Sequence, residues 1–222
     1  MTTRYEAARR RIQSSGVLAL LLLALAASLV TAAPASAAPA AKTVLVMGDS
    51  LSAGYGMAAA EGWVELTAQR ITREKPQWRV VNTSISGETT AGGRSRIIDA
   101  VVRERPEVVV IALGANDGLR GLPTARSADN LAYMIGAAHG AGAKVLLIGM
   151  QMPPNLGVTY TKAFAQNYRT LATRFDVALL PFLLQPIAAD RDAYQDDNLH
   201  PTAAVQPRLR DHVWSALAPL LQ

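Results

Sequence analysis

The strongest constraint on the fold of this chain is an alternation of two kinds of segment from residue 42 onward. Short runs rich in β-branched residues alternate with longer segments whose apolar residues recur at a helical period. This alternation is typical of a parallel sheet covered by helices on both faces. The predicted strands span residues 43–47, 79–82, 108–113, 144–149 and 177–180.

The segments between these strands predict the helices of the domain. Pro106 and Pro181 stand at segment boundaries, where proline ends a helix, and Gly140 and Gly142 lie where a helix gives way to a strand. The sequence has no internal repeat, so residues 38–222 are predicted to form one α/β domain. The predicted helices span residues 62–74, 89–105, 124–141, 159–174 and about 205–220.

The first 37 residues have the layout of an export signal peptide. Four arginines within residues 4–11 precede an uncharged apolar run at 16–30, and Ala35-Ser36-Ala37 fits an A-x-A cleavage site. We expect cleavage after Ala37 and a mature chain in the periplasm or outside the cell. The alternative is an uncleaved membrane anchor, because residues 38–41 add no charge after the apolar run.

Composition excludes several classes of protein. The chain has no cysteine, which rules out disulfides, a cysteine nucleophile and thiolate metal sites. Residues 1–37 hold four of the 22 Lys and Arg and one of the 17 Asp and Glu, so the mature chain carries a net charge of only +2. We therefore expect no nucleic-acid partner.

Residues able to do chemistry follow the predicted strands directly. Ser50 comes after the first strand, Gly87 after the second and Asn116 after the third, while Asp197 and His200 precede the last helix. Ligands of an open parallel sheet bind beyond the carboxyl ends of its strands. We therefore expect these five residues at one edge of the sheet.

Ser50, His200 and Asp197 can supply the three parts of a serine nucleophile system. A serine hydroxyl needs a base to take its proton, and the base needs a third group that fixes its tautomer. The spacing of three lets Asp197 reach Nδ1 of His200 while Nε2 faces Ser50. Asp196, four residues before His200, is the alternative orienting acid.

A tetrahedral intermediate also needs hydrogen-bond donors directed at its oxyanion. The candidates are the backbone N–H of Ser50, the backbone N–H of Gly87 and the side-chain amide of Asn116. Alone, Gly87 and Asn116 would be ordinary turn or cap residues, so this assignment depends on the whole set.

Four segments match one known family. They resemble the signature blocks of the SGNH (GDSL-type) hydrolases: GDSLSAGYG (48–56), SISGETTAGG (84–93), LGANDGLRG (113–121) and DDNLHP (196–201). The chain is most similar to the periplasmic branch called thioesterase I, protease I, lysophospholipase or arylesterase, since MQMPPNLGVTYTKAF (150–164) also fits it. The G-x-S-x-G elbow of α/β-hydrolases is absent from the sequence.

The resemblance implies a flavodoxin-like three-layer α/β/α sandwich with a five-stranded parallel sheet. It gives Ser50, Gly87, Asn116 and His200 the four name-giving roles, has Asp197 complete the triad, and implies no metal and no cofactor. One departure is Asn198, where related sequences often carry glycine, and we expect it to alter the turn rather than the chemistry.

The implied reaction is hydrolysis of small acyl esters or thioesters, including aryl esters and lysophospholipids, through an acyl-enzyme. Residues 151–159 offer apolar surface beyond the fourth strand, and we expect Met152, Pro153 and Leu156 to contact the acyl chain. The alternative is that these side chains only pack the loop.

Two rival functions remain open at this point. A carbohydrate acetyl esterase of the same fold would have an aromatic-lined cleft, and only Tyr55 is an aromatic residue close to the motifs. A catalytically silent binding module would most simply have lost Ser, Asp or His. We expect a monomer that makes transient contact with membrane lipids.

Overall fold

The computed structural model describes residues 41–222 of the chain. The predicted signal peptide, residues 1–37, lies outside the described residues, so its cleavage remains a prediction.

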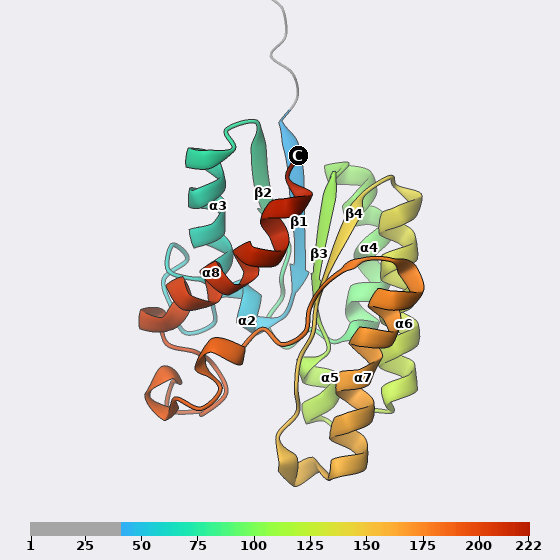
Figure 1. The fold of residues 1–222 in the computed structure, drawn as a ribbon, viewed down its shortest axis with the longest axis vertical. Coiled ribbons are helices and arrows are strands. Elements are labelled where there is room, and N and C mark those ends of the chain that lie inside the picture. Colours follow the sequence, from blue (N-terminus) through green and yellow to red (C-terminus); the bar gives the residue numbers. More distant parts are fainter. Residues whose placement is uncertain (1–40) are drawn as a thin grey trace, which may run out of the picture. The chain divides into compact units, whose positions relative to one another are not determined.

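Five parallel strands form one sheet in the order β2-β1-β3-β4-β5 (Figure 1). Because β1 lies between β2 and β3, the chain moves outward first in one direction and then in the other. Because all five strands run in the same direction, their carboxyl ends lie at one edge of the sheet. The ends of β1 and β3 are neighbours there. The strands are β1 (Lys42–Gly48), β2 (Trp78–Asn82), β3 (Val108–Ala112), β4 (Lys144–Ile148) and β5 (Ala178–Leu180).

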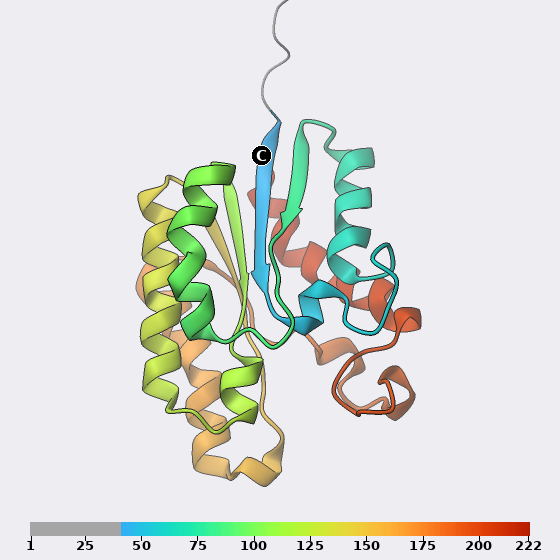
Figure 2. The ribbon, with the colours of Figure 1, turned by 180° about the vertical axis from the view of Figure 1, so that it is seen from behind.

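Helices cover both faces of this sheet. Helices α3 and α8 pack on one face, and α4, α6 and α7 pack on the other; α8 lies in front of the sheet in Figure 1 and behind it in Figure 2. The long helices are α3 (Trp63–Glu74), α4 (Thr90–Glu104), α6 (Thr124–Gly140), α7 (Val158–Phe175) and α8 (Gln206–Leu217).

Alternate residues of the strands enter two separate core clusters. In β3, which is buried along its whole length, Val108 and Val110 pack toward α3 and α8, whereas Val109 and Ile111 pack toward α4, α6 and α7. A strand covered on both faces must be apolar at every position, which explains its unbroken hydrophobic run. The three-layer sandwich and the five-stranded parallel sheet are confirmed.

The predicted boundaries agree with the structure to within one residue for every strand and for the first four long helices. The last helix begins at Gln206 and ends at Leu217, followed by a 3₁₀ turn, η5 (Ala218–Leu220). The pattern missed two short helices at the functional edge, α2 (Ser50–Ala53) and α5 (Ala115–Leu119). Within residues 41–222, no helix is long and apolar enough to span a bilayer.

Candidate active site

Ser50 lies in a tight turn where β1 passes into α2. Asp49 caps this helix, since its Oδ1 accepts a hydrogen bond from the N–H of Leu51 at 3.0 Å. Gly48 allows a close approach, because a Cβ at this position would lie 2.6 Å from Oγ of Ser52. The turn thus holds Ser50 at the carboxyl end of β1.

Ser50, His200 and Asp197 form a continuous chain of hydrogen-bonding atoms. Nε2 of His200 lies 2.8 Å from Oγ of Ser50, and Nδ1 lies 2.6 Å from Oδ2 of Asp197. Asp197 also accepts backbone N–H bonds on Oδ1, from Leu199 at 2.9 Å and from His200 at 3.0 Å. Both carboxylate oxygens are therefore fixed in place, with one directed at the imidazole.

The rival acid does not reach the imidazole. Within residues 41–222 the carboxylate of Asp196 makes no hydrogen bond, and only its backbone carbonyl accepts one, from the side chain of Asn198. Asn198 has φ of +57°, a left-handed conformation that asparagine tolerates better than most residues. Asparagine therefore fits this turn.

The hydrogen bonds to Asp197 also determine its ionisation. The backbone N–H of His200 and then its ring lower the pKa of Asp197 to about 2. The carboxylate is thus charged at any pH at which a histidine base is neutral, as an orienting acid must be.

The three candidate oxyanion donors, on Ser50, Gly87 and Asn116, line one pocket together with His200. In the described part of the chain, the backbone N–H groups of Ser50 and Gly87 donate no hydrogen bond. Nδ2 of Asn116 donates one hydrogen bond, to the carbonyl of Glu88 at 2.9 Å, which fixes the amide and leaves its second N–H available.

Gly87 is required for its backbone conformation rather than for space. Its φ is +80°, whereas an added Cβ would meet no atom within 4 Å. A residue with a side chain would strain this conformation, which sets the direction of the Gly87 N–H.

A buried carboxylate holds the helix that carries Asn116. Asp117 accepts hydrogen bonds from the backbone N–H of Thr90 at 2.8 Å, from the Thr90 hydroxyl at 2.5 Å and from the Ser127 hydroxyl at 3.1 Å. These bonds tie α5 to the starts of α4 and α6. Asn116 is thereby held against the loop that contains Gly87.

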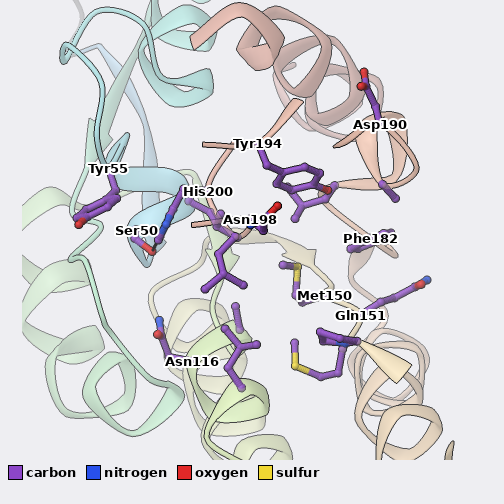
Figure 3. Close-up of a pocket in the computed structure, with 18 of the residues that line it drawn as sticks. Ser50, Tyr55, Asn116, Met150, Gln151, Phe182, Asp190, Tyr194, Asn198 and His200 are labelled. Carbon is purple, nitrogen blue, oxygen red and sulfur yellow. Dashed lines mark hydrogen bonds between the residues drawn. The ribbon is translucent and has the colours of Figure 1, made fainter. Parts of the chain in front are cut away.

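The pocket has a volume of about 790 Å³, within the range of small-molecule sites. Figure 3 shows Ser50 and His200 on one side of it and Phe182 with Asp190 on the opposite side. Met152 and Pro153 line the pocket, and their contact with an acyl chain stays a prediction. Leu156 does not line the pocket, because it lies in η1 (Pro154–Leu156) and packs against the second core cluster.

Sequence reasoning missed the wall formed by the segment after β5. Phe182, Leu184 and Tyr194 line the pocket together with Tyr55, whose ring centroid lies 4.5 Å from that of His200. The chain is therefore richer in aromatics at the site than its motifs suggest. No motif marks this wall, although its apolar residues before the DDNLHP block were visible in the sequence.

Burial opposes the charge of Asp49. The side chain is only 2% exposed, and desolvation raises its pKa to about 6, an effect that the N–H of Leu51 and the nearby His200 only partly offset. An acid whose pKa is raised in the folded state makes its full contribution to stability below its pKa in the unfolded chain, near 3.8. This contribution is lost as pH rises through the pKa in the folded state, about 6.

We therefore expect Asp49→Asn, which stays neutral, to gain stability over the wild type as pH rises. The advantage in free energy of unfolding should grow by up to about 3 kcal/mol between about pH 4 and pH 8. Urea unfolding of both proteins at these two pH values measures it. A difference that stays constant with pH would contradict the raised pKa.

Comparison with known proteins matches residues 46–206 to the GDSL-like lipase/acylhydrolase family. The chain is 45% identical to esterase TesA of Pseudomonas aeruginosa over 96% of its own length and all of that protein. It is 38% identical to thioesterase 1/protease 1/lysophospholipase L1 of Escherichia coli K12, over 83% of this chain and 87% of the relative. The crystal structure of TesA superposes with a TM-score of 0.78 at 46% identity, covering 81% of this chain and 99% of TesA.

Proposed function

Because the chain belongs to the GDSL-like lipase/acylhydrolase family, we propose that it hydrolyses acyl esters and thioesters through an acyl-enzyme formed on Ser50. The enzyme is a carboxylic ester hydrolase, like the relatives named esterase and thioesterase. The observation that carries the proposal is the continuous chain from Ser50 Oγ through His200 to Asp197.

In the first half-reaction, Oγ of Ser50 attacks the acyl carbonyl while Nε2 of His200 takes the hydroxyl proton. The carboxylate of Asp197 accepts the Nδ1–H bond, which keeps Nε2 free to act as the base and stabilises the imidazolium. His200 then gives the proton to the departing alkoxide or thiolate. In the second half-reaction, His200 activates water in the same way, and the acid leaves.

The negative charge that develops on the carbonyl oxygen needs donors already in place. The N–H groups of Ser50 and Gly87 and the amide of Asn116 can supply them from three separate strand ends. Removal of one such donor typically costs roughly 3 kcal/mol of transition-state stabilisation. Met152 and Pro153 supply apolar surface for the acyl chain, and each methylene buried there would favour binding by about 0.8 kcal/mol.

An activity profile tests this proposal. Purified protein should hydrolyse p-nitrophenyl esters with acyl chains of about two to sixteen carbons, an acyl-CoA series and a lysophospholipid, with an optimum length set by the apolar pocket. EDTA should leave the rates unchanged. Hydrolysis of none of these substrates, or activity lost to EDTA and restored by a divalent metal, would contradict the proposal.

A carbohydrate acetyl esterase is the second candidate, because the rings of Tyr55, Phe182 and Tyr194 line the pocket. Aromatic faces of this kind could stack on sugars. The same profile separates the two functions when acetylated xylan is added to it. If the protein deacetylates xylan faster than it hydrolyses the p-nitrophenyl esters of the profile, the carbohydrate acetyl esterase is favoured.

Export and removal of residues 1–37 complete the proposal. The alignment with the Pseudomonas relative covers 96% of the chain, so it extends well into the segment that precedes residue 41. This supports a shared N-terminal segment rather than one peculiar to this chain. The mature enzyme, residues 38–222, would then act in the periplasm or outside the cell.

A further inference from the structure

Large hydrophobic side chains are exposed mainly along one edge of the described fold. Residues 41–222 contain nine exposed large hydrophobic residues, and six of them lie in segments that follow the carboxyl ends of strands. The other three, Ile98, Val102 and Tyr133, belong to helices α4 and α6. We call the six the apolar collar: Tyr55, Ile85, Leu119, Leu122, Val158 and Leu199.

Every strand contributes to this collar. Tyr55 comes from the segment after β1, Ile85 from that after β2, Leu119 and Leu122 from that after β3, Val158 from that after β4, and Leu199 from that after β5. A single exposed apolar side chain is ordinary on a protein surface. Six that follow five different strands at one edge are a grouping of the kind that marks an interaction surface.

Half of the collar lies at the pocket itself. Tyr55, Leu119 and Leu199 line the pocket and are also exposed, while Ile85 directly precedes Ser86 and Gly87, which line it as well. Val158 follows the pocket wall formed by residues 150–154 and starts α7. The apolar lining of the pocket therefore continues outward into the collar.

From this continuity we propose that the apolar collar docks the enzyme on the surface of a phospholipid bilayer or micelle, with the pocket mouth facing the lipid. Its side chains come from segments that follow five different strands, and they form no single helix face or strand edge on which a peptide could lie. A lipid surface requires no matching shape, so a ring of isolated aliphatic and tyrosine side chains suits it.

Substrate chemistry agrees with this partner, whereas charge favours neither sign of surface. Arg120 and Arg191 are exposed in the same segments as the acids Asp192 and Asp196, so docking is expected to depend on burial of the apolar side chains. This inference rests on the proposed function, because long acyl chains are held in lipid surfaces, and an acyl chain leaving the surface would enter the pocket directly.

A matched pair of valines provides the test. Val158 is 65% exposed in the first turn of α7, at the collar, and Val102 is 67% exposed in the last turn of α4. Helix α4 starts at the carboxyl edge and runs back, so Val102 lies at the opposite edge. Val158→Gln should lower binding to vesicles of phosphatidylglycerol and phosphatidylcholine about tenfold, whereas Val102→Gln should leave it unchanged.

The measurement is vesicle co-sedimentation of protein that begins at Ala38, which retains all five strands and both core clusters. Leu122→Gln should behave like Val158→Gln, since neither side chain lines the pocket. All three variants should hydrolyse p-nitrophenyl acetate at the wild-type rate. This water-soluble ester tests the proposed function separately, because vesicle binding requires no catalysis.

Three results would overturn the docking proposal. The first is wild-type protein that does not bind vesicles, and the second is equal loss of binding in Val102→Gln and Val158→Gln. The third is a wild-type dimer in analytical ultracentrifugation that Val158→Gln converts to a monomer, because the collar would then be covered by a second copy of the chain.

Discussion

Replacing Ser50 with alanine is expected to lower kcat/KM for ester hydrolysis by about 10⁴-fold or more and to leave the fold intact. The variant keeps the caps and backbone donors of the turn but has no oxygen to attack the carbonyl. Apart from its contact with His200, the Ser50 hydroxyl makes no hydrogen bond within residues 41–222, so its loss leaves no other partner unsatisfied.

Ser52→Ala is the matched control on the same helix. Its hydroxyl is buried and makes no hydrogen bond in the described part of the chain, so its removal should leave activity within about twofold of the wild type. A serine-directed organophosphonate should label Ser50 and no other serine in peptide mass mapping. Substantial esterase activity in Ser50→Ala would exclude this residue as the nucleophile.

The elements that the sequence predicted best are the buried strands and the long helices. In β3 every residue is apolar because both faces are covered, and in α4 the buried positions, from Thr90 to Val101, recur at a helical period. The short helices α2 and α5 contain four and five residues, too few to show a period. They are formed by capping and tertiary contacts, such as those of Asp49 and Asp117.

The candidate site could be predicted where its residues lie in motifs, and only there. Ser50, Gly87, Asn116 and His200 were found because each lies in a block with its own spacing. Phe182 and Tyr194 were missed, since they reach the pocket from a segment of 3₁₀ turns that has neither a period nor a motif. Leu156 was expected at the pocket, but the turn of η1 directs it to the core.

The choice between Asp196 and Asp197 shows what spacing leaves open and backbone geometry decides. Both carboxylates are close enough in sequence to reach His200. The turn directs Asp197 inward, where two backbone N–H groups bind its Oδ1, and leaves the Asp196 carboxylate without a hydrogen bond in the described residues. The two acids therefore predict different results when each is replaced by asparagine.

Asp197→Asn should reduce kcat by about 10⁴-fold, because the substitution reverses one hydrogen bond and keeps the rest. The N–H groups of Leu199 and His200 require an acceptor, so the amide oxygen must stay on them and the NH₂ group must face Nδ1. Nδ1 would then have to accept, which moves the ring proton to Nε2 and leaves no base beside Ser50.

Asp196→Asn should keep its activity within about twofold, since its exposed carboxylate contacts nothing that the reaction uses. Steady-state kinetics of both variants, with thermal melts to verify folding, measure the difference. Wild-type activity in Asp197→Asn, or a larger loss in Asp196→Asn, would mean that the carboxylate nearest the imidazole does not orient it.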